Sequence, residues 1–406
     1  MGLFKKRTVV EETINNKDIE TEEFQRVTLE PKKKESIWTR EITFKGLRAR
    51  KEEKLDKPKS VKLVGIDIGS NSIKFVEGRV KAGKIHIYGM GKIPTPKDAV
   101  RDGAVEQVEA VSIAIRDYLR SRGIKTKDLA FASSSSTIIS RELIVPYVEK
   151  KDELKNLVEY EIQQFLFINL NNYEVQFMKI GDVVDNGIEK QKILAIIYPK
   201  NIIASYKELT TRMLLDPYAL DLSNNAVRKV ANLANFFNSD LVDKESTNMF
   251  IDFGAKTTNI SIVNRGKLDF IRILQIGGEE IDSFISTNKS ISLEAAEKIK
   301  IDKMDIEQKV ENDELTDGVI RIIDDWVSDI NRIIQFYANK GSGKQIDHIY
   351  LCGGTSKIKG LDKYIENRLR IPTANILTID NLEFDKKLGV STVEEYVNAI
   401  GALIRL

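Results

Sequence analysis

The sequence is poor in the residues that disulfide frameworks and most metal sites need. It contains one cysteine, Cys352, and two histidines, His86 and His348, among 406 residues. One cysteine excludes a disulfide within the chain and every multi-cysteine zinc pattern. Both histidines fall in segments with a strand-like pattern, which disfavours Ser-His catalysis and histidine-ligated metals. We therefore expect Cys352 to be a buried core thiol.

Long apolar runs and a dominant charge are also missing. No stretch approaches the ~18 apolar residues that a membrane-spanning helix needs, and the start, MGLFKKRTVVEE, has no signal-peptide core. Lys6 stands where the myristoylation pattern needs Ser or Thr. The formal net charge is only +2, so no global field favours nucleic acid. These features predict a cytoplasmic protein with no membrane span and no nucleic-acid partner.

The length of the chain and the changes in composition along it predict several structural units. At 406 residues it exceeds the size at which one core usually keeps growing, so two lobes are expected. Residues 1–60 are polar and of mixed charge, which predicts a flexible extension; a basic arm on an anionic membrane is the alternative. The boundaries we expect are 61–139 for the first lobe, 140–217 for an inserted α+β subdomain, 218–246 for a return to the first lobe, 247–380 for the second lobe with a helical part around 280–340, and 381–406 for a last return to the first lobe.

Apolar periodicity predicts the elements of these units. VKLVGID is expected to be a buried strand, followed by the strands SIKFVEGRV and KIHIYGMGKI. Apolar residues at helical spacing predict a helix over about 103–122 that stops at Gly123. Further helices are expected over 150–166, over 201–215 and in the final segment EEYVNAIGALIRL. Strands alternating with helices indicate mixed sheets with helices packed on them.

The stretch GIDIGSNSIK, at residues 65–74, has the composition of a phosphate-binding turn. Asp67 ends an apolar strand, and Gly69 permits a sharp backbone turn. Lys74 falls on the following strand, from which its ammonium could reach a β- or γ-phosphate. The hydroxyls, the amide and the backbone N–H groups of the turn can form an anion-binding nest, and they belong to Ser70, Asn71 and Ser72.

A near copy, IDFGAKTTN, follows at residues 251–259 and offers Asp252, Gly254, Lys256, Thr257 and Thr258. A single Gly-Ser turn between strands is weak evidence because such turns are common. Two copies at the starts of two lobes indicate an internal duplication, in which facing hairpins would enclose a triphosphate. Asp67 and Asp252 would then hold Mg²⁺ through water and orient an attacking water.

Two Gly-Gly turns are further candidates for the same site. IYLCGGTSKIKGL places Gly353, Gly354 and Thr355 after a strand, where the missing β-carbons would let a nucleoside lie against the backbone. An ordinary strand-to-helix turn is the alternative there. IGGEEID contributes Gly277, Gly278 and Glu280 at the start of a helix. Helix capping is an adequate explanation of Glu280, and the alternative is that this turn forms a wall of the nucleotide site.

These motifs, in this order, resemble the nucleotide-site motifs of the actin, hexokinase and DnaK-type chaperone superfamily. The resemblance covers nearly all of residues 61–406. It comprises a phosphate-1 motif at 67–74, a connecting helix at 221–227, a phosphate-2 motif at 252–258, an adenosine turn at 353–355 and a final helix at 398–402. It implies an α/β, actin-like ATPase fold of two lobes, each with a mixed sheet and flanking helices, that binds ATP or ADP with Mg²⁺.

Within that superfamily the chain resembles the PilM family of type IV pilus machines. VGIDIGSNSIKFVE, LDPYALDL, IDFGAKTTNISIVNRGKL and AIGALIRL carry this likeness. It implies that the inserted subdomain is FtsA-like. It also implies a PilN-like inner-membrane partner, whose cytoplasmic N-terminal peptide would dock near the strands around 131–145 and the helix 151–166. The protein would then lie at the inner face of the cell membrane through its partners, with other pilus proteins and self-association left open.

One departure from the family and two alternative functions stand beside this prediction. In the family a start like MGLFKK leads almost directly to the phosphate-1 strand, whereas residues 7–60 intervene here. A sugar or acetate kinase would need an Asp base near its acceptor, for which Asp221 is the one candidate, although an Asp before a helix is more often a cap. A filament former related to FtsA or MreB is the other alternative. We prefer an ATP-binding assembly adaptor in which any hydrolysis is slow.

Overall fold

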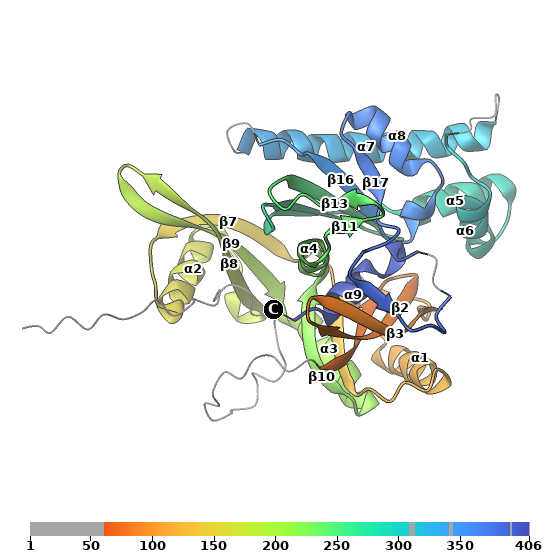
Figure 1. Cartoon of the computed structure of the whole chain (residues 1–406), viewed down its shortest axis with the longest axis horizontal. Helices are drawn as coiled ribbons and strands as arrows, with labels where there is room; N and C mark the ends of the chain where they lie inside the picture. Colours follow the sequence, from red (N-terminus) through yellow and green to blue (C-terminus); the bar gives the residue numbers. More distant parts are fainter. Residues whose placement is uncertain (1–60, 308–312, 341–343, 390–391, 406) are drawn as a thin grey trace, which may run out of the picture. The chain divides into compact units, whose positions relative to one another are not determined.

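The computed structural model describes residues 61–307, 313–340, 344–389 and 392–405 (Figure 1). The segment 1–60, predicted to be an extension, lies outside the described residues. Within the described ranges the chain forms three sheets of three or more strands and three apolar cores. None of the helices in these ranges is both long enough and apolar enough to cross a bilayer.

The first sheet has six strands in the order β10-β6-β1-β2-β3-β18. β1 and β2 form an antiparallel hairpin, while β1, β6 and β10 run parallel. Parallel strands covered on both faces have nearly continuous apolar sequences, as KLVGIDI does in β1. The strands are β1 (Lys62–Ile68), β2 (Ser72–Lys81), β3 (Lys84–Pro94), β6 (Asp128–Ser133), β10 (Asp216–Leu222) and β18 (Leu382–Phe384). The helices that pack with this sheet are α1 (Val108–Ser121), α3 (Lys200–Met213), α4 (Ser223–Leu233) and α9 (Val397–Leu403).

The helix predicted over 103–122 was placed too early along the chain. Helix α1 begins at Val108, and a small hairpin of β4 (Val100–Arg101) and β5 (Ala104–Val105) precedes it. Val105 is buried in the first core, so its apolar character belongs to the hairpin and not to the helix. The predicted stop is confirmed, since α1 ends at Ser121 and Gly123 takes a left-handed φ of 64°.

A three-stranded antiparallel sheet, ordered β7-β9-β8, carries one helix and has a core of its own. Its elements are β7 (Ile139–Pro146), α2 (Lys151–Phe165), the short helix η2 (Leu170–Asn172), β8 (Tyr173–Asp185) and β9 (Ile188–Pro199). Leu154, Val158 and Ile162 recur every four residues along α2 and are its buried positions. Within the described residues β7 pairs only with β9, so β7 is an edge strand.

The second large sheet has five strands in the order β15-β14-β13-β16-β17. Trp326 of the long helix α7 stacks on Phe253 in its core. The strands are β13 (Thr247–Phe253), β14 (Thr258–Asn264), β15 (Lys267–Leu274), β16 (His348–Cys352) and β17 (Thr373–Asn375). The helices are α5 (Gly278–Lys289), α6 (Leu293–Asp302), α7 (Glu314–Lys340) and α8 (Leu361–Leu369), and the short elements are β11 (Phe236–Phe237), β12 (Asp240–Leu241), η3 (Thr355–Lys357) and η4 (Glu394–Tyr396).

Two helices connect the two large sheets. Helix α4 packs on β14 and β15, and α9 packs on β1, β2 and β6, while α4 and α9 pack against each other. Their close approach depends on Gly401, because a β-carbon there would collide with the carbonyl of Ala226 in α4. The α4–α9 contact therefore fixes how the hairpin β1–β2 and the hairpin β13–β14 are placed.

Filling this contact should destabilise the protein. Gly401→Val forces α9 away from α4, and overpacking of this kind costs about 1–3 kcal/mol. Thermal unfolding followed by circular dichroism should therefore show a lower Tm. Gly181→Val is the matched control, because a β-carbon at Gly181 meets open space; equal melting of the two variants would contradict this account.

Candidate functional site

The tips of hairpins β1–β2 and β13–β14 have the same backbone geometry. In the first, the Gly69 N–H donates to the Ser72 carbonyl at 3.1 Å, and in the second, the Gly254 N–H donates to the Thr257 carbonyl at 3.0 Å. The strand register pairs Asp67 with Lys74 in the first hairpin. The two tips are thus equivalent structures, as the repeated sequence predicted.

Both tips line one cavity of about 410 Å³. Twelve of the predicted site residues lie on its walls. Asp67, Gly69, Ser70, Asn71, Ser72 and Lys74 come from the first hairpin, Asp252, Gly254 and Thr257 from the second, and Gly353, Gly354 and Thr355 from the segment after β16.

The other predicted residues do not face this cavity. Lys256 lines an adjoining pocket of about 210 Å³ and pairs with Glu279 at 3.6 Å. Thr258 is fully buried and donates its hydroxyl to the Ile276 carbonyl at 2.9 Å.

The Gly-Gly turn before α5 packs against the second hairpin tip and does not line the cavity. The Gly278 N–H donates to the Gly254 carbonyl at 3.0 Å, and a β-carbon at Gly278 would collide with the hydroxyl of Thr355. A β-carbon at Gly277 would likewise collide with the Ala255 carbonyl. The Glu280 carboxylate accepts from the indole N–H of Trp326 at 3.0 Å, which holds α5 to α7.

Asp221 also lies outside the cavity. Its carboxylate pairs with the ammonium of Lys229 at 2.6 Å, and the two side chains are 4% and 1% exposed. Burial lowers the pKa of Lys229, although Asp221 opposes that shift. Lys229 also donates to the Ile404 carbonyl at 2.7 Å, so this pair ties α4 to the residue after α9.

The two cavity aspartates lie close to each other and to Asn398 of α9. The Nδ2 group of Asn398 donates to Asp252 Oδ2 at 2.9 Å. Burial raises the pKa of Asp67, and the neighbouring charge of Asp252 raises it further, while Lys74 and Asn398 oppose this shift. Lys74 Nζ lies 3.7 Å from Asp67 Oδ2. Two carboxylates on different sheets therefore converge on one point.

Several buried acceptor atoms on the cavity wall have no hydrogen-bond partner within the described residues. They are Asn259 Oδ1, Asn398 Oδ1, Asp282 Oδ1 and Glu394 Oε2. Buried acceptors of this kind require a donor from a ligand or from water. The described residues contain no cluster of three acidic, histidine or cysteine side chains that could ligate a metal directly. A hydrated cation, whose waters donate hydrogen bonds, fits this wall better than a dehydrated one.

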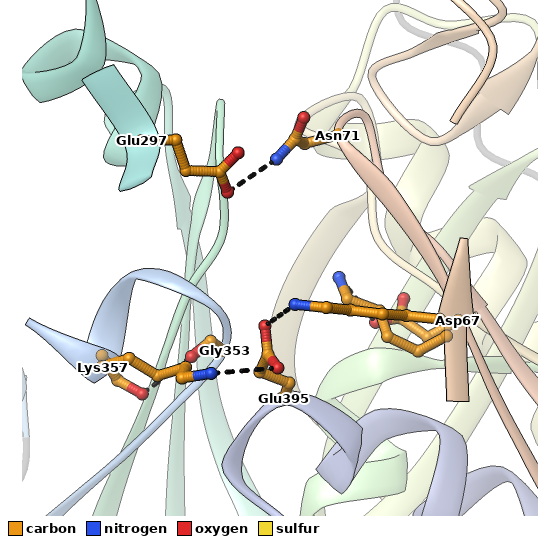
Figure 2. A network of polar contacts seen from close by, with 9 residues as sticks. Asp67, Asn71, Glu297, Gly353, Lys357 and Glu395 are labelled. Carbon is orange, nitrogen blue, oxygen red and sulfur yellow. Dashed lines mark hydrogen bonds and ion pairs between the residues drawn. The ribbon is translucent and has the colours of Figure 1, made fainter. Parts of the chain in front are cut away.

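Charged side chains join the two sides of the cavity (Figure 2). Asn71, at the first hairpin tip, donates to Glu297 of α6 at 3.0 Å. Glu395, in η4, accepts from Lys92 of β3 at 2.7 Å and from Lys357 at 3.4 Å. Burial alone would raise the pKa of Glu395, but these lysines together with Lys74 hold it below its ordinary value.

Sequence reasoning missed several residues on the cavity wall. Asn259 was detectable, because the register places it opposite Asp252 as Lys74 lies opposite Asp67. Asn398 stands at the start of the expected final-helix motif but was not assigned to the site. Glu297 and Lys300 carry no comparable signal, since both belong to an ordinary polar helix. Cys352 is buried as expected, at the end of β16.

A second hollow, of about 760 Å³, lies beside the three-stranded sheet and is called here the β7 groove. One wall comes from β7 and α2, and the other from β15 and α7. Glu142 of β7 pairs with Lys340 of α7 at 2.7 Å and with Lys192 at 2.8 Å, which links the two walls. The expected peptide site at 131–145 and 151–166 overlaps this groove at β7 and α2, but the facing wall belongs to the second large sheet.

Two sheet lobes joined by α4 and α9, with a duplicated hairpin at one cavity, define the actin-like α/β fold that the sequence predicted. The family model for type IV pilus assembly protein PilM matches residues 65–402. This chain belongs to that family and is a pilus assembly protein with an actin-like fold.

Similar proteins agree with this assignment. Cell division protein FtsA of Enterococcus faecalis is 21% identical over 380 residues, which cover 83% of this chain and 84% of that protein. FtsA of Staphylococcus epidermidis is 19% identical over 381 residues, covering 82% and 78% of the two chains. The solved PilM-PilN type IV pilus biogenesis complex contains a chain that superposes with a TM-score of 0.72 at 18% identity, covering 85% of this chain and 100% of that one.

The raised pKa of Asp67 makes the stability of the ligand-free protein depend on pH. The folded protein binds the Asp67 proton more tightly than the unfolded chain does, so this proton stabilises the fold below about pH 4, and that stabilisation is lost as the pH rises through the raised pKa. Asp67→Asn has no proton to lose there, so its stability does not fall for this reason. Its stability relative to the natural chain, measured by urea unfolding, should increase from pH 4 upward and then level off. A difference that does not vary with pH would contradict this cause.

Proposed function

We propose that this protein binds Mg²⁺ and ATP between its two hairpin tips and acts as a nucleotide-dependent adaptor for a PilN-like peptide. One observation carries the nucleotide part of the proposal. Asp67 and Asp252 lie on different sheets, yet both line one cavity, close enough for the charge of Asp252 to raise the pKa of Asp67. Two converging carboxylates repel each other, and a bound metal ion would relieve that repulsion.

The residues present suit a hydrated Mg²⁺. Asp67 and Asp252 would hold it through water, and the unpaired oxygens of Asn259 and Asn398 would accept hydrogen bonds from the same waters. Mg²⁺ bound there would neutralise phosphate charge. The backbone N–H groups and hydroxyls of the two tips would bind phosphate oxygens, and Lys74 would contribute a cation.

The nucleoside would lie towards Gly353 and Gly354. Gly353 has a φ of 90°, and a β-carbon there would collide with Asp252 Oδ1 and the Phe253 carbonyl. Thr355 donates to the Gly254 carbonyl at 2.9 Å, so this turn is tied to the second hairpin tip. The turn therefore approaches Asp252 too closely for any residue but glycine at position 353. The missing side chain also leaves the cavity open beside Gly353.

An adaptor is supported over a kinase. A kinase needs a carboxylate base near the hydroxyl of a bound acceptor. Asp221, the one candidate for that role, is 4% exposed, pairs with Lys229 and does not line the cavity. Any ATP hydrolysis would therefore rely on Asp67 or Asp252 to orient water, and we expect it to be slow.

The β7 groove is the proposed site of a PilN-like peptide. Three apolar side chains on its walls are more than half exposed, Ile144 at 51%, Phe165 at 55% and Phe336 at 57%. One edge of β7 pairs with no strand of the described residues, and such an edge suits an extended peptide, which gains backbone hydrogen bonds from the strand and affinity from apolar anchors. Through an inner-membrane partner of this kind, the protein would lie at the cytoplasmic face of the membrane.

The two sites are proposed to communicate through the lobes. The walls of the groove belong to different sheets, and Glu142 and Lys340 join them. Closure of the lobes around a nucleotide is a hinge motion that would change the width of the groove. Peptide affinity should therefore differ between the ATP-bound, ADP-bound and ligand-free forms.

Isothermal titration tests the nucleotide site. Mg·ATP should bind the natural protein, and Asp252→Ala should weaken binding about 100-fold, because contacts to charged groups contribute about 3 kcal/mol. Asp240→Ala, at an exposed position on β12, is the control and should bind normally. Absence of Mg·ATP binding by the natural protein would remove the nucleotide proposal.

Peptide binding tests the groove. A fluorescent peptide copying the cytoplasmic N-terminus of the PilN-like protein should bind in the presence of Mg·ATP. Phe336→Glu should weaken it about tenfold by placing a charge at an apolar anchor. Leu241→Glu, also at an exposed apolar position but outside the groove, should have no effect. Equal affinity for the peptide in the ATP-bound, ADP-bound and ligand-free forms would remove the proposed coupling but would leave the groove as the binding site.

A further inference from the structure

The β7 groove has a second candidate occupant within the chain itself. Exposed apolar residues scattered singly are ordinary, but several on one groove indicate a surface that is covered in use. The apolar side chains Ile144, Phe165 and Phe336 lie on both walls, and Phe270 and Ile333 line the groove with them. An edge strand with free backbone groups is also a template for another strand.

One stretch of the N-terminal extension has the pattern of such a strand. Residues 38–45, WTREITFK, place Trp38, Ile42 and Phe44 on one face of a strand, with Arg40 as the polar residue on that face and polar residues at 39, 41, 43 and 45 on the other. Leu47 adds a further apolar residue. These residues lie outside the described part of the structure, so the pattern is a property of the sequence. It stands out in an otherwise polar segment that the family's usual start does not contain.

We propose that residues 38–47 occupy the β7 groove of the same molecule. The segment would pair with the edge of β7 opposite β9, and Trp38, Ile42 and Phe44 would cover the exposed apolar side chains of the groove. At Ser140, β7 already touches β15, because the Ser140 hydroxyl donates to the Ile271 carbonyl at 3.4 Å, so the segment would pair with β7 beyond Ser140. No strand of the described residues other than β9 pairs with β7.

The connecting chain is long enough for this arrangement. Fourteen peptide steps separate Leu47 from Val61, and an extended chain spans about 3.5 Å per residue, or about 49 Å in all. The path from Val61 to Ile139 runs along β1, across one strand spacing to β6 and through the loop into β7. The step from β1 to β6 is perpendicular to the strands, so strand rise and extended-chain length limit the straight-line distance to about 45 Å, within the reach of the linker.

Such a segment would regulate the proposed peptide site. A segment tethered by a short linker acts at an effective concentration of the order of millimolar, so even a weak contact competes with an external peptide. A PilN-like peptide would have to displace residues 38–47. This regulatory consequence rests on the proposed function, whereas occupation of the groove by the segment does not.

Paired cysteines in the full chain test the contact directly. The one native cysteine, Cys352, is 1% exposed and does not interfere. Phe44→Cys combined with Ile144→Cys, or with Phe336→Cys, should form a disulfide within one chain under mild oxidation. Phe44→Cys with Tyr88→Cys, an exposed position on β3 outside the groove, should react at least about tenfold more slowly. Equal rates, or no disulfide with either groove position, would overturn the proposal, and disulfides that form only between chains would replace it with a contact between copies.

Tryptophan fluorescence gives an independent readout. The chain has two tryptophans, Trp38 and Trp326, and Trp326 is 1% exposed and gives a constant background. Ile144→Glu should make Trp38 more accessible to acrylamide, while Leu241→Glu should not change it. Unchanged quenching in Ile144→Glu would overturn the proposal. Neither readout involves nucleotide or a PilN-like peptide, so failure here is distinct from failure of the proposed function.

Discussion

The convergence of two carboxylates on one cavity is the constraint on which this molecule depends. Asp67 and Asp252 lie near the ends of strands in different sheets, and both line that cavity, where Asn398 of α9 donates to Asp252. Burial raises the pKa of Asp67, and repulsion from the charge of Asp252 raises it further. A neutral residue at either position would remove this repulsion, yet both positions are aspartate. Such an arrangement is expected where a bound cation and an anionic ligand complete the site.

The rest of the fold keeps these two hairpin tips opposite each other. Segments from late in the chain, β18 and α9, return to the sheet that contains β1, and α4 leads from that sheet to β14 and β15. The contact of α4 with α9 at Gly401 and the buried pair of Asp221 with Lys229 fix this junction. Asp221 therefore has a structural explanation in the hinge region, where sequence reasoning had considered a catalytic base.

The sequence was informative where backbone geometry limits the choice of residue. The turns at Gly69 and Gly254, the glycines at 353 and 354, and the limits of α2 and α3 followed from local patterns. Residues whose role depends on distant partners were harder to predict. Glu280 looked like a cap or a nucleotide contact, but it bonds Trp326 from a helix 46 positions away along the chain. Glu395 and Glu297 meet Lys92 and Asn71 only after the lobes assemble, so no local signal identifies them. The late start of α1 shows the same limit, because a buried hairpin residue mimicked the helical period.

The pairing of Glu142 with Lys340 across the β7 groove has a thermodynamic consequence for the proposed coupling of the two sites. If closure around ATP alters the groove, then occupation of the groove must alter the affinity for ATP by the same factor, because linkage is reciprocal. A peptide in the groove would then change the fraction of the protein that holds nucleotide at a given ATP concentration, without any change in the residues that contact the nucleotide.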